Sequence, residues 1–341
     1  MGAAGAAYSG ALYASDVTPS GAVGVTCSKL GVSGITSQGE DGAMLDPDFR
    51  WHIGSNTKAM TAALYARLVD LGRCQWGVSV PSLFPAMASH PAWSDISIEE
   101  LLSHAAGLTD SFVDGSWLDA RRIDAKSPRE QRRDLVERVL GSPPPERRGI
   151  YRYGNLNYVL VGAAIEQAVD ASWEEALRRE LFTPLRLGEA GFGAPPRNGP
   201  WGREADGGIL KRVDPLLGTA DNPAVLWPSG GVHISAPGYA QFLASYLGGP
   251  VRLLRPEALK RLLTPARPDL SYAGGWSLDG PSGSPASRLT HDGSNTLWFA
   301  SAIIDCEHGH GYAAFANCGG ERGASITTSI LQDLTSRASV S

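Results

Sequence analysis

Ser55 and Lys58, three residues apart, are the pair in this sequence whose types and spacing best suit chemistry. They lie in residues 51–60, where Gly54 permits a turn and the following apolar residues repeat at helical spacing. On a helix, positions three apart share one face, so the hydroxyl and the amine would lie close together. An amine can take the hydroxyl proton only when its own charge is suppressed, for example by burial. The pair predicts an activated serine nucleophile, although among five lysines chance could also supply it.

Two further segments carry groups that could complete a site. Tyr153 and Asn155 stand directly before a predicted helix, and they supply a phenol and an amide. His291, Gly293 and Ser294 stand between two predicted strands, where an imidazole is followed by a small residue and a hydroxyl. Each short motif alone would be weak evidence, but the three segments in this order are specific.

The three segments resemble the signatures S-x-x-K, Y-x-N and K/H-x-G of the serine β-lactamase and penicillin-binding-protein superfamily. Tyrosine in the second motif resembles the branch of class C β-lactamases, D,D-peptidases and family VIII esterases. The resemblance spans about residues 20–335 and includes the framing stretches 101–108, 153–158 and 229–232.

This resemblance implies a role for each catalytic residue. Ser55 would be the nucleophile, with Lys58 and the phenol of Tyr153 around its oxygen. The backbone N–H groups of Ser55 and Ser294 would form an oxyanion hole. For Tyr153 to accept a proton, its ordinary pKa of about 10 must fall, and an adjacent ammonium group would lower it.

The substrate-binding residues implied by the resemblance are Asn155, His291 and Gly293. Asn155 would bind the acyl side of the substrate, and His291 would border the site from the edge of the sheet. The third motif departs from the common Lys-Thr-Gly, because His291 replaces the lysine and Asp292 replaces the threonine. A neutral imidazole beside an aspartate binds a substrate carboxylate poorly. The departure therefore favours substrates that lack this carboxylate.

The sequence thus predicts a serine hydrolase that acts through an acyl-enzyme on Ser55, with a carboxylesterase-like activity on small esters or amides. A β-lactamase, a D-amino-acid peptidase or an acyltransferase of the same superfamily is the alternative. A sensor that captures an acyl ligand without turnover is the alternative from another class. No cofactor is predicted. No metal is predicted either, because His308 and His310 lie in a predicted hairpin turn without a third ligand.

The predicted fold is α/β (α+β), with a central antiparallel sheet flanked by helices and an inserted all-helical lobe, as in β-lactamases and transpeptidases. Predicted strands lie near both ends of the chain, and the expected domains are residues 1–74 with 225–341 for the sheet and 75–224 for the lobe. Residues 190–225 show no period and are interpreted as a long surface excursion. The predicted strands are 21–37 as a pair, 272–278, 288–290, 296–305 and 311–317, and the predicted helices are 55–72, 97–107, 127–141, 155–171, 172–182, 237–247, 256–263 and 324–336.

Composition sets limits on the partners. The 341 residues carry a net charge of −5 without a dense Lys/Arg block, so nucleic-acid or anionic-membrane binding is disfavoured and a small-molecule substrate is expected. No run of 18 apolar residues predicts a membrane span. The four cysteines have no metal-like spacing and are interpreted as reduced thiols. Residues 1–14 make a poor signal peptide, which predicts a cytoplasmic protein unless a leader is missing from the sequence. The oligomeric state is left open.

Overall fold

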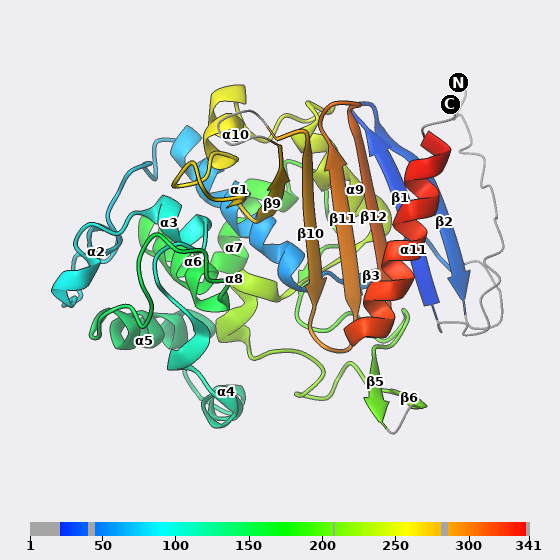
Figure 1. Ribbon diagram of the computed structural model, residues 1–341. Coiled ribbons are helices and arrows are strands. Elements are labelled where there is room, and N and C mark those ends of the chain that lie inside the picture. Colours follow the sequence, from blue (N-terminus) through cyan, green and yellow to red (C-terminus); the bar gives the residue numbers. More distant parts are fainter. Residues whose placement is uncertain (1–20, 40–44, 207–208, 281–285, 339–341) are drawn as a thin grey trace.

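The computed structural model describes residues 21–39, 45–206, 209–280 and 286–338, and it is built around a seven-stranded antiparallel sheet (Figure 1). The strand order is β2-β1-β12-β11-β10-β9-β8. The strands are β1 (Gly21–Ser28), β2 (Gly31–Gly39), β8 (Tyr272–Ala273), β9 (Trp276–Asp279), β10 (Arg288–Ser294), β11 (Phe299–Asp305) and β12 (His310–Ala316).

The first and last parts of the chain meet in this sheet, as the sequence predicts. Strand β1 pairs with β12, with Val25 opposite Ala313. Helix α11 (Gly320–Ala338) crosses one face and α9 (Ala236–Tyr246) packs on the opposite face of these strands (Figure 1). Because both faces are covered, β12 is nearly continuous in small and apolar residues instead of alternating with polar ones.

Helices gather beside the β8–β10 side of the sheet (Figure 1). The central one is α1 (Thr57–Asp70), and α6 (Asn155–Val169) packs against both α1 and α8 (Trp227–Gly230). These contacts run between residues 75–224 and the rest of the chain, so the division into two domains remains a prediction. The remaining helices are α2 (Val80–Leu83), α3 (Ile98–Leu102), α4 (Gly115–Arg122), α5 (Pro128–Leu140), α6 (Asn155–Val169), α7 (Trp173–Leu177), α8 (Trp227–Gly230) and α10 (Pro256–Leu262).

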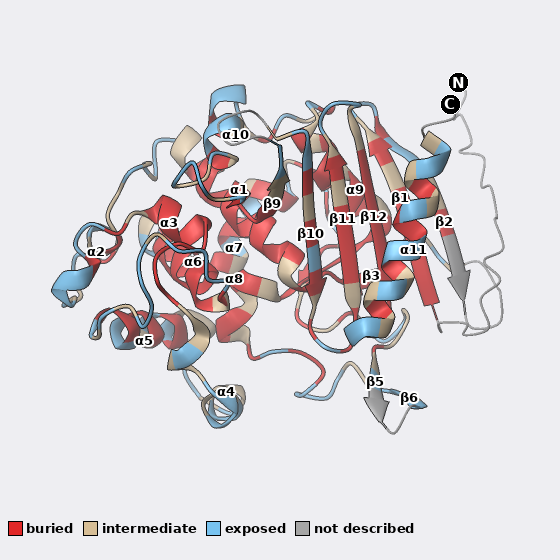
Figure 2. Ribbon diagram, in the orientation of Figure 1, coloured by how far each residue is buried: buried red, intermediate tan, exposed pale blue. Residues whose placement is uncertain are grey.

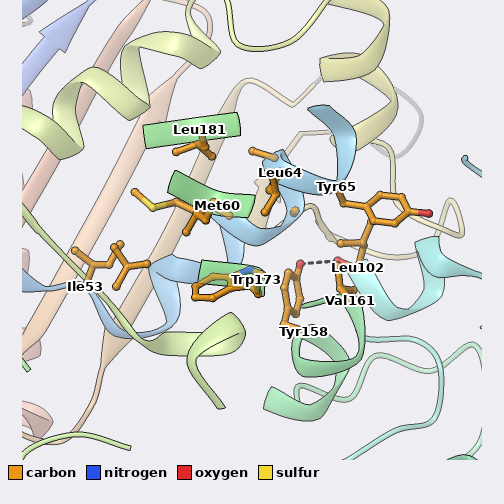
Figure 3. Packing of buried hydrophobic residues seen from close by; sticks show 14 of the residues in the cluster. Ile53, Met60, Leu64, Tyr65, Leu102, Tyr158, Val161, Trp173 and Leu181 are labelled. Carbon is orange, nitrogen blue, oxygen red and sulfur yellow. Dashed lines mark hydrogen bonds between the residues drawn. The ribbon is translucent and has the colours of Figure 1, made fainter. Parts of the chain in front are cut away.

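Helix α1 is the core of this helical region and is buried along almost its whole length (Figure 2). Its side chains Met60 and Leu64 pack with Trp173 and Leu181 from the segment after α6 (Figure 3). The Tyr158 hydroxyl of α6 nearby donates a hydrogen bond of 2.9 Å to the Leu102 carbonyl oxygen (Figure 3). Close packing on all sides fixes the position of the first turn of α1.

Three helices begin with the capping box in which a serine and a glutamate satisfy each other's backbone N–H groups. The pairs are Ser97 with Glu100, Ser127 with Glu130 and Ser172 with Glu175. The sequence predicts the first two as capping boxes and the third Ser-x-x-Glu segment as the opening of a helix, and all three helices start where these signals predict. No helix in the described ranges combines the length and apolarity needed to cross a bilayer.

The structure corrects four predictions. The predicted helix 97–107 ends at Leu102, and two residues later His104 takes a positive φ of 54°, which a helix does not allow. The predicted strand 272–278 is a tight hairpin of β8 and β9, because Gly274 and Gly275 take positive φ angles of 58° and 87°. The predicted helix 172–182 changes to wider turns at Arg178–Phe182. Residues 190–225 contain three short strands whose two to four residues are too few to give a readable period. These are β4 (Gly191–Phe192), which pairs with β7 (Val232–Ser235) beside β3 (Arg50–His52), and the hairpin of β5 (Arg203–Asp206) and β6 (Ile209–Arg212).

Candidate active site

The turn that carries Ser55 contacts the end of strand β10 directly. Ser55 lies in a short 3₁₀ turn, Gly54–Asn56, that leads into α1, and Gly54 has a φ of +49°. A β-carbon at Gly54 would lie 2.3 Å from the Ser294 amide nitrogen, and one at Gly293 would lie 2.7 Å from the Ser55 amide nitrogen. Only glycine at both positions permits this backbone-to-backbone approach. The amides of Ser55 and Ser294 are thereby brought to the same place.

Lys58 is fully buried behind Ser55 and has three hydrogen-bond partners. Its Nζ lies 3.0 Å from Ser55 Oγ, 2.9 Å from Asn155 Oδ1 and 2.8 Å from the Ser229 carbonyl oxygen. Asp110 fixes the orientation of the Asn155 amide, because Asn155 Nδ2 donates to Asp110 Oδ2 at 2.9 Å. Two of the three partners of Lys58 Nζ, the amide and carbonyl oxygens, can only accept hydrogen bonds, whereas the Ser55 hydroxyl can also donate one.

Burial lowers the pKa of Lys58 to about 7, with the charge of Asp110 acting in the opposite direction. A neutral amine has two N–H groups and one lone pair. These match the two acceptors, Asn155 Oδ1 and the Ser229 carbonyl, and the hydroxyl of Ser55. The geometry can thus hold Lys58 as a base aimed at Ser55.

Tyr153 precedes α6 and lies beside the Lys58 amine, on the side of the site that is open to solvent. Its ring centroid is 4.8 Å from Lys58 Nζ, and the residue is 43% exposed. The predicted fall in its pKa is wrong. Desolvation by the packing around the phenol raises the Tyr153 pKa, and a hydrogen-bonding interaction with Ser55 offsets this only in part. Burial also lowers the pKa of Lys58, which disfavours the ammonium charge that would stabilise a phenolate at Tyr153.

Aromatic residues form a wall behind Tyr153. The His104 ring lies 4.5 Å from the Tyr153 ring and 4.8 Å from the Tyr272 ring, measured between centroids. His104 has a φ of +54°, and its Nδ1 accepts a long hydrogen bond of 3.4 Å from the Gly154 N–H. Burial lowers the pKa of His104 well below its ordinary value. His104 thus orders the segment before α6 as a neutral ring.

His291 lies in β10 on the other side of Tyr153, with ring centroids 6.4 Å apart. It is buried, and its Nε2 lies 3.5 Å from the Tyr272 hydroxyl. Burial, and then the nearby Lys58, lower the pKa of His291 to about 3, so the ring is neutral at physiological pH. A cavity of about 270 Å³ opens beside it, and its walls are Tyr151, Tyr153, Tyr272, Ser277, Thr290, His291 and Asp292.

The end of β10 offers a free edge at this cavity. The pairing of β10 with β9 covers Arg288–Thr290, whereas its pairing with β11 continues to Ser294. Among the described residues, no strand therefore pairs with the other edge of β10 at residues 291–294. Exposed peptide groups on such an edge can bind an extended substrate.

The structure thus places together the predicted site residues, which come from three distant parts of the chain: Ser55, Lys58, Tyr153, Asn155, His291, Gly293 and Ser294. Asp110 and Tyr272 were missed, since neither belongs to a recognised motif. Ser229 was noted only as part of a framing stretch, although its carbonyl contacts Lys58.

The two histidines of the predicted turn, His308 and His310, have other partners. His308 Nδ1 lies 3.0 Å from the Asp305 carboxylate, and His310 Nδ1 lies 3.3 Å from the Tyr312 hydroxyl. Within the part of the chain that the structure describes, no group of three or more His, Cys, Asp or Glu side chains could hold a metal ion. The four cysteines are free thiols.

Comparison with known proteins identifies the family. The sequence model of the Beta-lactamase family matches residues 15–335. The chain belongs to the β-lactamase family. Similar curated proteins are penicillin-binding protein 4 of Amycolatopsis lactamdurans, 32% identical over 46% of this chain and 39% of that protein, and unguisins hydrolase ungD' of Aspergillus campestris, 31% identical over 41% and 27%. The alignments thus span less than half the length of either relative.

Solved structures show the same fold. A penicillin-binding protein from Bacillus halodurans superimposes with a TM-score of 0.72 at 18% identity, covering 92% of this chain and 96% of that one. A D-stereospecific amidohydrolase from Streptomyces sp. superimposes with a TM-score of 0.68 at 22% identity, covering 89% and 92%. The family match and a relative named as a hydrolase support a serine hydrolase, and the predicted mixed fold of this chain is confirmed.

Proposed function

We propose that this protein is a serine hydrolase that forms an acyl-enzyme on Ser55 and acts as a carboxylesterase on small esters without a carboxylate. The observation that carries the proposal is the set of partners around Lys58. A fully buried amine with a pKa of about 7 has two fixed acceptors, and its remaining position faces Ser55 Oγ.

In the acylation step, Ser55 Oγ attacks the carbonyl carbon of the ester, and its proton moves to the neutral Nζ of Lys58. The negative oxygen of the tetrahedral intermediate accepts hydrogen bonds from the backbone N–H groups of Ser55 and Ser294. Each such donor is typically worth about 3 kcal/mol of barrier. The intermediate collapses as the C–O bond to the leaving alcohol breaks. The alcohol takes a proton from the phenol of Tyr153, which Lys58 then restores.

In the deacylation step, a water molecule attacks the acyl carbonyl carbon. Its proton passes to Lys58, which is neutral again, and the C–O bond to Ser55 breaks. Lys58 returns the proton to Ser55 Oγ, and the carboxylic acid product leaves. Because the pKa of Tyr153 is raised, its phenol stays protonated at rest and has a proton available for the leaving alkoxide.

The charges around the cavity support uncharged substrates. His291 has a pKa of about 3 and provides no cation, whereas Asp292 lines the same cavity and is exposed. Lys58 lies buried behind Ser55 instead of facing the cavity. Among the described residues that line this cavity, a substrate carboxylate would meet an aspartate and no lysine or arginine.

A pair of esters with the same leaving group tests this substrate class. We expect kcat/KM for p-nitrophenyl butyrate to exceed that for mono-p-nitrophenyl succinate at least tenfold, because the two acyl groups differ mainly in charge. Asp292→Asn should narrow this gap by raising the succinate value. Equal rates for both esters in the wild type would contradict the charge argument. Turnover of the cephalosporin nitrocefin at a rate comparable with the butyrate would favour the β-lactamase alternative.

The pH dependence follows from the pKa of Lys58. Since the base must be neutral, kcat/KM for p-nitrophenyl butyrate should be low at pH 5, rise through an apparent pKa near 7 and level off above pH 8. Rates measured between pH 5 and 9, corrected for spontaneous hydrolysis, give this profile. A rate that is flat across pH 6–8, or one that falls as the pH rises, would exclude Lys58 as the base.

A further inference from the structure

A buried polar cluster outside the groups used above connects the two sides of the oxyanion hole. His52, at the end of β3, is fully buried, and its Nδ1 accepts a hydrogen bond of 3.1 Å from the Gly54 N–H. Its Nε2 lies 3.1 Å from Asp221 Oδ1, close enough for an ion pair but without a full hydrogen bond. Because Nδ1 acts as an acceptor, a neutral ring carries its proton on Nε2, on the side of Asp221.

The cluster continues from Asp221 to the end of β10. Asn295 Nδ2 donates to Asp221 Oδ1 at 3.0 Å, and also to the Ala220 carbonyl oxygen at 3.2 Å. Asn295 Oδ1 accepts from the backbone N–H groups of Leu297 and Trp298, both at 3.2 Å. Its side chain is thus held on both ends. Asn295 directly follows the residue whose amide faces the nucleophile turn.

We propose that His52, Asp221 and Asn295 are positioning residues that keep the backbone N–H groups of Ser55 and Ser294 at the spacing needed to bind an oxyanion. This inference rests on the proposed function. His52 accepts from the Gly54 N–H, one peptide group before the Ser55 amide, and the Asn295 side chain fixes the residue that follows Ser294. Asp221 lies between His52 and Asn295. The three residues are called the bridge below.

Position matters here more than binding strength. Oxyanion-hole donors act only when they are aimed at the developing charge, and a displacement of about 1 Å can reduce the rate about 100-fold. The two amides come from a turn and a strand end that are 239 positions apart in the chain, so their spacing depends on contacts between distant segments. The close approach at Gly54 and Gly293 is one such contact, and the bridge is a second.

Burial of the bridge also argues for more than packing. His52 and Asn295 are 0% and 7% exposed, and His52 stacks on Trp298 with centroids 6.1 Å apart. Apolar residues of similar volume would fill this space without the cost of desolvating an imidazole, a carboxyl and an amide. The hydrogen bonds from Gly54 to His52 and from Asn295 to Asp221 fix directions, which apolar packing does not.

The test removes the middle of the bridge with Asp221→Ala and uses Asp214→Ala as a matched control. Asp214 lies seven residues earlier in the chain, bonds to the Leu216 N–H and pairs with Arg197, away from the nucleophile turn. For Asp221→Ala we expect kcat for p-nitrophenyl butyrate to fall 10- to 100-fold, with KM changing less than threefold. The affinity for an alkylboronic acid, which forms a tetrahedral adduct with a serine nucleophile, should fall by the same factor as kcat. Asp214→Ala should match the wild type in all three measurements.

A second measurement does not depend on activity. Amide hydrogen exchange of peptides covering residues 50–58 and 291–299 should increase in both segments in Asp221→Ala and in neither segment in Asp214→Ala. His52→Asn replaces Asp221→Ala in this test if Asp221→Ala does not fold. The asparagine retains an acceptor near the Gly54 N–H but does not reach Asp221, so the same loss of kcat and the same rise in exchange are expected. Exchange that rises in only one segment would overturn the bridge. Increased exchange in both segments, together with an unchanged kcat and an unchanged affinity for the boronic acid, would also overturn the bridge. A wild type that neither hydrolyses esters nor binds the boronic acid would instead refute the proposed function, while the exchange data still decide whether the bridge exists.

Discussion

Ser55→Ala is expected to reduce the hydrolysis of p-nitrophenyl butyrate by on the order of 10⁴-fold or more. The substitution removes the oxygen that forms the covalent intermediate. Ser55 Oγ, 3.0 Å from Lys58 Nζ, is the hydroxyl that this base activates in the proposed mechanism. The residual rate should be that of water attack assisted by the oxyanion hole. A stopped assay corrected for the spontaneous reaction measures the difference.

The control for this prediction is Ser245→Ala on α9, whose hydroxyl donates to the Phe242 carbonyl oxygen within its own helix. It should hydrolyse the ester at the wild-type rate. Equal activity in the wild type and Ser55→Ala, or no activity in either, would contradict the proposed function.

Lys58→Met is expected to reduce kcat by about 10³-fold or more while leaving KM within a few-fold. Methionine fills nearly the same buried volume but cannot take the Ser55 proton. Proton transfer by a positioned base typically contributes 10²- to 10⁴-fold. The fold should persist, because Ala59, Ala62 and the rest of α1 pack in an apolar core. Circular dichroism and thermal unfolding check that the loss is chemical.

Lys58→Arg separates proton transfer from charge. The arginine side chain retains a positive charge and hydrogen-bond donors, but it does not give up its proton in this pH range. If Lys58 acts as a base, Lys58→Arg should be as inactive as Lys58→Met. Recovery of more than a tenth of the wild-type rate in Lys58→Arg would indicate that the charge, and not the proton transfer, is the essential property.

The parts of the site that the sequence predicts are those fixed by local geometry. Ser55 and Lys58 share a helical turn, and the small residues Gly54 and Gly293 are needed wherever two backbones approach closely. The order of the three motifs supports the family resemblance, and this resemblance predicts that Tyr153 lies beside Ser55 and Lys58. Capping boxes at Ser97 and Ser127 likewise mark helix starts through neighbouring residues alone.

The parts that the sequence does not reveal depend on contacts between distant segments. Asp110 orients Asn155 across 45 positions, and Asp221 meets Asn295 across 74, with no periodic or motif signal for either. The Tyr153 pKa was predicted in the wrong direction for the same reason. Its value depends on how strongly its surroundings exclude water and on the suppressed charge of Lys58, which only the packed structure shows.

The covalent intermediate is the central claim, and mass spectrometry of the intact protein tests it most directly. Incubation with p-nitrophenyl pivalate, whose bulky acyl group slows deacylation, should give a single mass increase equal to one pivaloyl group. Peptide mapping should locate this group on Ser55, and it should disappear as water releases the acid. It should be absent in Ser55→Ala. A persistent adduct on Ser55 would favour the sensor alternative over turnover. Ester hydrolysis in the wild type with an adduct on another residue, or an adduct that survives in Ser55→Ala, would contradict the account.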